Sequence, residues 1–219
     1  MLIDLDLKQK SAVVLGGGSE AELKAAKLVD AGASTTVVAR RFTKGLQALS
    51  QSGEVRLIER DPRDAETLIR EIRPRALFIS TGEPQLDEDL ASLGRSLGIL
   101  VCVVDAPRLN DFNMPALAKV GTLRIAISTG GKSPAMAKML RKRIEKMILP
   151  EDLLQVELQE SIRGRIGGSV NSHAERKRMV YDVIRDPEVT RLLKANDLPG
   201  AKARAASVIR VRKRSKERS

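Results

Sequence analysis

The stretch SAVVLGGGSEAELKAAKLVDAGASTTVVA, residues 11–39, decides the fold. Residues 11–16 form an apolar, β-branched run that predicts a buried strand, and residues 34–39 predict a second strand of the same kind. The segment between them predicts a helix that ends at Gly32. Because two parallel strands need a crossover of this kind, the stretch predicts a βαβ unit.

The turn between the first strand and the helix carries Gly16, Gly17 and Gly18. With Ala21 in the third place, the spacing fits the glycine pattern of dinucleotide-binding turns. Missing side chains let the backbone approach a pyrophosphate, which the helix N-terminus then stabilises. The turn therefore predicts nucleotide binding, and the alternative is a tight packing turn without a ligand.

Two arginines, Arg40 and Arg41, follow the second predicted strand, where the ribose of a dinucleotide is read. An acid at this place favours NAD, whereas an arginine can accept the phosphate of NADP. The residues alone thus lean toward NADP or permit either cofactor. The alternative is a solvated basic pair.

Three further strands are predicted at residues 55–58, 76–80 and 99–104, with helices at 64–72 and 85–97. This alternation predicts a doubly wound parallel sheet, an α/β fold of the Rossmann type. Ser80 and Thr81 follow the fourth strand, and Asp105 follows the fifth. We expect all three at the same sheet edge as the glycine turn, near the nicotinamide end of a dinucleotide.

The rhythm changes after Asp105, because prolines and asparagines interrupt residues 107–115. A sixth strand is predicted at residues 122–129, then a Gly130-Gly131 turn and a helix over 133–147 that Ser133 caps. Beyond it the chain predicts helices at 151–163, 174–185, 187–194 and 201–208, with a loop at 167–172. The predicted parts are a nucleotide-binding domain (1–113), a central segment (114–149), a helical domain (150–209) and a disordered basic tail (210–219).

Composition narrows the class of protein. The 219 residues are 42% hydrophobic and 31% charged, which is typical of a globular chain. A net charge of +11 favours anionic partners, but only 2% aromatic residues argue against nucleic acid as the partner. No apolar run is long enough to cross a membrane. The single cysteine, Cys102, lies in an apolar run; we expect a core residue and a reducing cytoplasm. No dedicated metal site is predicted, and the single histidine, His173, is expected at the surface.

Four motifs together resemble the precorrin-2 dehydrogenase / sirohydrochlorin ferrochelatase family, the siroheme-synthase type. They are VVLGGG (13–18), GASTTVVA (32–39), VVDAPRLNDFNMPA (103–116) and IAISTGGKSPAMAKMLRKRIE (125–145). The resemblance covers residues 3–152. It implies NAD⁺-dependent oxidation of precorrin-2 to sirohydrochlorin and, in some members, insertion of Fe²⁺ to give siroheme. It also implies a homodimer in which residues 114–149 form the dimerisation segment.

The resemblance assigns roles to particular residues. The essential aspartate of the family falls on Asp105. A hydroxyl residue, phosphorylated in some members, falls in the Ser128-Thr129 pair. The dinucleotide contacts fall on Gly17, Gly18, Ser19, Glu20, Arg40 and Arg41.

Precorrin-2 is a polycarboxylate macrocycle, so its site should be cationic and lined by glycine. We expect that site at Thr129, Gly130, Gly131, Lys132 and Ser133. Removal of a hydride leaves a proton to be accepted, and Asp105 is the predicted general base. The plainer alternatives are a loop cap for Asp105 and a turn residue for Thr129. The competing function is a nucleotide-sensing regulatory Rossmann domain without turnover.

Overall fold

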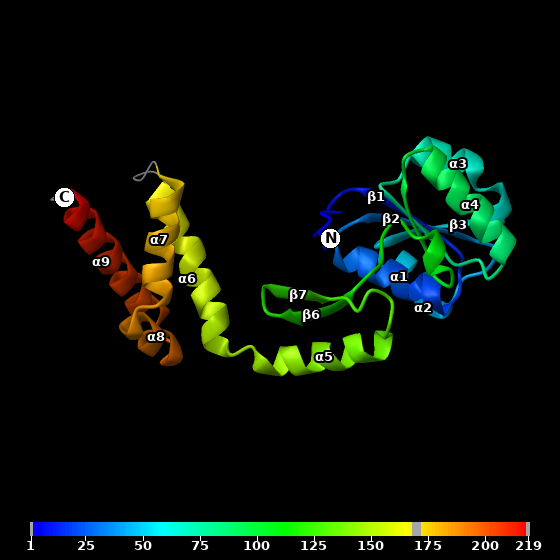
Figure 1. Ribbon diagram of the computed structural model, residues 1–219. Helices are drawn as coiled ribbons and strands as arrows, with labels where there is room; N and C mark the ends of the chain where they lie inside the picture. Colours follow the sequence, from blue (N-terminus) through cyan, green and yellow to red (C-terminus); the bar gives the residue numbers. More distant parts are fainter. Residues whose placement is uncertain (1, 168–171, 218–219) are drawn as a thin grey trace. The chain divides into compact units, whose positions relative to one another are not determined.

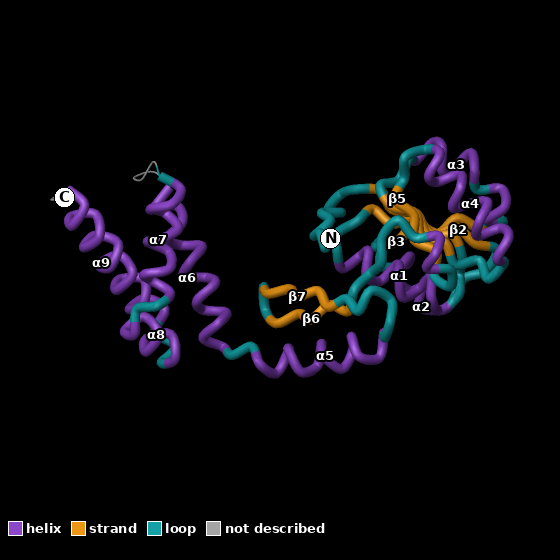
Figure 2. Tube along the Cα trace, viewed as in Figure 1, coloured by secondary structure: helices purple, strands orange, loops and turns teal. Residues whose placement is uncertain are grey.

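The computed structural model describes residues 2–167 and 172–217, and its chain divides after Met114 into two compact units. The first unit holds a five-stranded parallel sheet in the order β3-β2-β1-β4-β5 (Figures 1 and 2). The strands are β1 (Ser11–Leu15), β2 (Ser34–Ala39), β3 (Val55–Glu59), β4 (Ala76–Ile79) and β5 (Leu100–Val103). This order confirms the Rossmann-like doubly wound sheet.

Helices cover both faces of that sheet. On one face lie α1 (Ser19–Asp30) and α2 (Lys44–Gln51); on the other lie α3 (Glu66–Ile72) and α4 (Pro84–Ser96) (Figure 1). Successive strand residues point to opposite faces, so neighbours in sequence enter different cores. Val14 and Phe78 pack on the side of α1, while Val13 and Leu77 pack on the side of α3 and α4.

Helix α2 was not expected from the sequence. It begins after Thr43, whose hydroxyl oxygen accepts a hydrogen bond from the amide of Leu46 at 3.2 Å. A side chain on Gly45 would start 2.1 Å from Glu22 of α1. This glycine lowers the helix propensity of the segment, but it lets α2 approach α1.

The loop after β5 bonds to the outer edge of that strand. A short 3₁₀ turn, η2 (Pro107–Leu109), leads into it. The side-chain oxygen of Asn110 accepts from the amide of Val103 at 2.6 Å, and a carboxylate oxygen of Asp111 accepts from the amide of Val101 at 2.9 Å. The amide of Asp111 donates to the carbonyl of Val101 at 2.9 Å. These bonds satisfy backbone groups at the outer edge of β5.

The second unit begins with an antiparallel hairpin of β6 (Ala116–Val120) and β7 (Leu123–Ile127). Strand β7 lies within the predicted sixth strand, whereas β6 was not expected. Helix α5 (Pro134–Met147) packs on the hairpin. The Ser133 hydroxyl accepts from the amide of Met136 at 3.2 Å, and Pro134 occupies the first turn, which confirms the predicted cap.

Four helices complete the second unit: α6 (Pro150–Gly167), α7 (His173–Ile184), α8 (Pro187–Lys194) and α9 (Leu198–Glu217). They share an apolar core that includes Leu158, Met179 and Val189. None of the helices in residues 2–167 and 172–217 is long and apolar enough to cross a membrane.

Of the predicted tail over 210–219, residues 210–217 continue α9 in the structure. Ile209, 6% exposed, anchors the helix just before them, and the following Lys, Arg and Glu residues are good helix formers. Residues 218–219 lie outside the described residues, as do 168–171 of the predicted loop. The separation of 114–149 from 150–209 stays a prediction.

Candidate functional site

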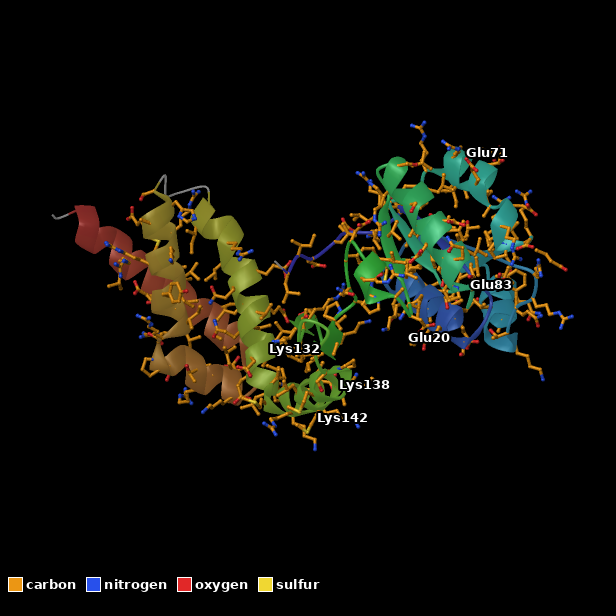
Figure 3. All side chains as sticks on the ribbon, turned by 45° about the vertical axis from the view of Figure 1, so that its right-hand side comes forward. Glu20, Glu71, Glu83, Lys132, Lys138 and Lys142 are labelled. Carbon is orange, nitrogen blue, oxygen red and sulfur yellow. The ribbon has the colours of Figure 1, made fainter. Side chains whose placement is uncertain are left out.

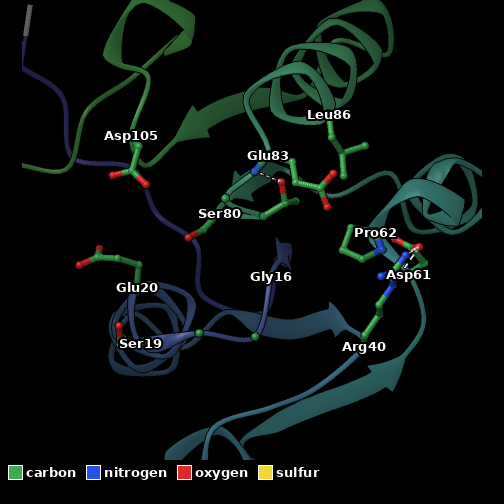
Figure 4. A pocket seen from close by; sticks show the side chains of 14 residues that line it. Gly16, Ser19, Glu20, Arg40, Asp61, Pro62, Ser80, Glu83, Leu86 and Asp105 are labelled. Atoms are coloured by element: carbon green, nitrogen blue, oxygen red, sulfur yellow. Dashed lines mark hydrogen bonds and ion pairs between the residues drawn. The ribbon is translucent and has the colours of Figure 1, made fainter.

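A pocket of about 360 Å³ opens at the carboxyl edge of the parallel sheet (Figure 4). Its lining comes from the glycine turn, the start of α1 and the loops after β2, β3, β4 and β5. The lining residues are Gly16, Gly17, Gly18, Ser19, Glu20, Arg40, Asp61, Pro62, Ser80, Thr81, Gly82, Glu83, Leu86 and Asp105. Residues far apart in sequence, predicted to share this edge, are therefore brought together.

The glycines of the turn have different tasks. Gly16 has a φ of +125°, and a Cβ on it would lie 2.2 Å from the carbonyl oxygen of Ser80. A Cβ on Gly17 would lie 1.8 Å from the carbonyl oxygen of Arg41. A Cβ on Gly18 would meet no described atom within 4 Å. Gly16 and Gly17 thus serve close packing, while Gly18 leaves open space beside the helix.

The start of α1 suits an anion. Gly18 is its N-cap and has no side chain to bond the first amides, so these groups are open to a ligand. The positive end of the helix dipole lies at the same place. The open space at Gly18 and these amides fit the pyrophosphate of a dinucleotide.

Arg40 does not stand free in the pocket. Its Nε donates to Oδ2 of Asp61 at 2.9 Å, and a second guanidinium nitrogen also contacts that oxygen (Figure 4). The hydrogen bond from Arg40 is the main cause that lowers the pKa of Asp61, and the same bond raises the pKa of Arg40. Arg41 is not among the described lining residues. The predicted pair of arginines thus contributes one paired guanidinium.

The loop after β4 is fixed by a buried carboxylate. Thr81 donates to Oδ1 of Asp87 from its hydroxyl at 2.6 Å and from its amide at 3.3 Å. The amide of Glu83 donates to the Thr81 hydroxyl oxygen at 3.2 Å. Asp87 is 6% exposed and belongs to the first turn of α4. It holds Thr81 in place, a role that the sequence alone did not reveal.

Asp105 lies two residues beyond β5 and lines the pocket. Figure 4 shows Asp105 and Glu20 at one end of the pocket and Arg40 with Asp61 at the other. The described lining therefore carries the carboxylates of Glu20, Asp61, Glu83 and Asp105 but one guanidinium. The first end of the pocket thus carries two carboxylates, and the second carries an ion pair.

The predicted substrate residues Thr129, Gly130, Gly131, Lys132 and Ser133 form one turn of the second unit, just before α5. The hydroxyl oxygen of Thr129 accepts from the amide of Ser133 at 3.0 Å, and that of Ser128 accepts from the amide of Gly130 at 3.2 Å. The plainer alternative for Thr129, a turn residue, therefore has a bond to support it. Its hydroxyl proton is still able to donate to a ligand.

The single cysteine and the single histidine differ in exposure. Cys102 is 5% exposed within β5, and burial raises the pKa of its thiol, which confirms a core residue. His173 is exposed at the start of α7. Within residues 2–167 and 172–217, no group of three His, Cys, Asp or Glu side chains is arranged to hold a metal.

The sequence matches two family models and is similar to known proteins. Residues 3–116 match the family model described as NAD(P)-binding, and residues 120–147 match that of the sirohaem biosynthesis protein central domain. A precorrin-2 dehydrogenase of Methanosarcina barkeri is 35% identical over 188 residues, with 84% of this chain and 83% of that protein covered. A siroheme synthase of Gluconobacter oxydans is 31% identical over 84% of this chain. The chain spans 39% of that longer protein.

A solved structure has the same fold. The structure of SirC, a precorrin-2 dehydrogenase, superposes with a TM-score of 0.68 and 20% sequence identity. The match covers 94% of this chain and 99% of the SirC chain. It therefore extends over both units of the fold.

Proposed function

We propose that this chain, which belongs to the family of precorrin-2 dehydrogenases and siroheme synthases, oxidises precorrin-2 to sirohydrochlorin with NAD⁺. The observation that carries the proposal is the pocket at the sheet edge, where the glycine turn, the start of α1 and Asp105 meet. A nucleotide sensor would need the first two features but not a carboxylate beside them.

The residues of the pocket divide the work. The bound nicotinamide would supply the hydride acceptor. The first amides of α1 would bind the pyrophosphate, and the Ser80-Thr81 loop, fixed by Asp87, would border the nicotinamide. Oxidation removes a hydride and a proton, and the Asp105 carboxylate would accept that proton.

The turn before α5 is the proposed site for the carboxylates of the macrocycle. Lys132 lies in this turn, and Lys138 and Lys142 project from α5 just beyond it (Figure 3). All three lysines are exposed. The Gly130 and Gly131 backbone, with φ of +61° and +80°, adds a stretch without side chains that a flat ring system can approach.

We also propose that the protein is a homodimer. The structure describes every residue of 115–149, and in this segment only Ala118 and Ala137 are buried. Met136 and Met139 on α5 are 42% and 46% exposed. A two-stranded hairpin with one helix cannot bury its own apolar surface, so a second copy would supply the missing cover.

Two expectations from the sequence belong to this proposal. Iron insertion into sirohydrochlorin would use Asp105 again, as acceptor of the pyrrole protons, with Fe²⁺ as a substrate. A cytoplasmic location stays a prediction that rests on the single cysteine.

The test is anaerobic incubation of the protein with precorrin-2 and NAD⁺, followed by addition of Fe²⁺. We expect NADH and sirohydrochlorin in equal amounts from wild-type protein. Asp105→Asn should lower the rate by about 10²-fold or more while NAD⁺ binding and the thermal unfolding midpoint are kept. NAD⁺ binding without oxidation by folded wild-type protein would favour the sensor. Near-normal oxidation by Asp105→Asn would exclude that carboxylate as the base. Faster metal uptake than in a protein-free control would add the second activity.

A further inference from the structure

We propose that Asp61 selects NAD⁺ over NADP⁺, because it occupies Arg40 and presents its own carboxylate to the adenosine ribose. The inference rests on the proposed use of a dinucleotide and adds the residue that decides between the two cofactors. From the sequence alone, Arg40 and Arg41 favoured NADP or permitted either cofactor.

Arg40 and Asp61 lie where a Rossmann fold contacts the adenosine ribose of its dinucleotide. Arg40 follows β2 directly, and Asp61 lies two residues beyond β3. These strands are neighbours, with Ala39 opposite Glu59. Both side chains line the pocket at the end away from Asp105 (Figure 4). In folds of this type the residue after the second strand meets the 2′ position of the adenosine ribose.

The charges at the Arg40–Asp61 end of the pocket disfavour the 2′-phosphate of NADP⁺. Both contacts from the guanidinium of Arg40 go to Oδ2 of Asp61. Arg63 contacts the same Oδ2 of Asp61 at 3.5 Å and also pairs with Glu83. Arg63 is not among the described lining residues, so the wall facing the pocket holds Arg40 against the carboxylates of Asp61 and Glu83.

A 2′-phosphate and a 2′-hydroxyl would therefore meet different surroundings. The phosphate would have to separate Arg40 from Asp61 or lie beside the carboxylates of Asp61 and Glu83, and both cost free energy. The hydroxyl can donate a hydrogen bond to Asp61 without breaking the pair, because a carboxylate has several acceptor positions.

The structural role of Asp61 can be separated from this selection. Its Oδ1 accepts from the amide of Arg63 at 3.1 Å and thereby caps the 3₁₀ turn η1 (Pro62–Asp64). Asparagine caps a helical turn about as well as aspartate does. Asp61→Asn thus keeps the cap and the shape but removes the negative charge.

The test measures binding of NAD⁺ and of NADP⁺ by calorimetry, without a tetrapyrrole. We expect wild-type protein to bind NAD⁺ more tightly than NADP⁺. Asp61→Asn should lower the preference for NAD⁺, measured as the dissociation constant of NADP⁺ divided by that of NAD⁺, by about tenfold or more. Arg40→Gln should leave NAD⁺ preferred, because the carboxylate stays. Asp64→Asn, in the same 3₁₀ turn but outside the described lining, is the matched control and should keep the wild-type ratio.

An unchanged ratio in Asp61→Asn would overturn the inference, and so would a selective loss of NADP⁺ binding in Arg40→Gln from a wild type that binds both. Either result would leave the proposed oxidation untouched, since NAD⁺ would still bind. Failure of folded wild-type protein to bind both cofactors would instead refute the dinucleotide site, and the proposed function with it.

Discussion

The nucleotide-binding unit and the hairpin with α5 bury their apolar residues to very different degrees. In the first, the parallel sheet separates two buried clusters, one against α1 and α2 and one against α3 and α4. In residues 115–149, all described, just two alanines are buried. The first unit buries two apolar cores of its own, whereas residues 115–149 leave most of their apolar side chains partly or fully exposed, as the proposed dimer would require.

The largest expected effect concerns the exposed apolar side chains of this segment. The double variant Met136→Asp, Met139→Asp should weaken self-association by roughly 100-fold or more, because it places charges where a partner would cover apolar side chains. Sedimentation equilibrium measures the change. Leu23→Asp on α1 is the matched control, since Leu23 and Met139 are both 46% exposed, and it should leave association unchanged. Equal association of wild type and the double variant would place the interface elsewhere.

The next effect sharpens the comparison within the first unit. Gly16→Ala should destabilise the fold by about 3 kcal/mol, because the added Cβ meets the Ser80 carbonyl and the φ of +125° disfavours a side chain. Gly18→Ala should keep the stability and weaken dinucleotide binding, since its Cβ points to open space. Denaturant unfolding and calorimetry give the two readouts. Equal stabilities of the two variants would contradict the division of tasks in the turn.

A smaller effect is expected at the edge of β5. Asn110→Ala removes the acceptor for the amide of Val103 and should cost about 1–3 kcal/mol of unfolding free energy. Asn113→Ala is the control, because Asn113 contacts the side chain of Asn110 and not the strand. It should cost clearly less in the same urea titration. A larger loss in the control would mean that the loop is held by other contacts.

The smallest effect is a dependence on pH in the helical part of the second unit. Asp186 caps α8 and pairs with Arg204 at 2.8 Å, and the hydrogen bond from Arg204 is the main cause that lowers the pKa of Asp186. A lowered folded-state pKa gives stability that is present above the unfolded value of about 3.9 and is lost as pH falls through the folded value.

Asp186→Asn should therefore be less stable than wild type at pH 7, and the difference should shrink below about pH 4. Thermal unfolding from pH 7 to pH 3 measures it. Glu160→Gln, a change at an exposed carboxyl of α6, should follow wild type throughout. A stability difference that stays constant with pH would mean that the charge of Asp186, and so its pair with Arg204, is not the cause.

Local sequence accounts for most of the first unit. Its strands are β-branched runs between turns, and such runs specify buried strands strongly. Helix α2 escaped prediction because Gly45 weakens its helical pattern, and the reason for that glycine is contact with Glu22, a tertiary fact. The β6 residues ALAKV favour a helix by propensity and become a strand through pairing with β7.

The site divides in the same way. The glycines, Ser80, Thr81 and Asp105 could be predicted, because each follows a strand and parallel strands end at one edge. Asp61 and Asp87 could not, because their roles depend on partners: Arg40 beyond a neighbouring strand for Asp61, and Thr81 in the loop after β4 for Asp87. A carboxylate two residues after β3 was the available signal for Asp61.

The loop of Asn110 and Asp111 also bears on how copies of this chain can meet. An outer strand with open amides and carbonyls invites strand addition from another molecule and, in the long run, aggregation. Here side chains occupy the amides of Val101 and Val103. An incoming strand would first have to displace its own chain's loop from these positions. The bonds from this loop to β5 thus disfavour the addition of strands from other molecules at that edge of the sheet.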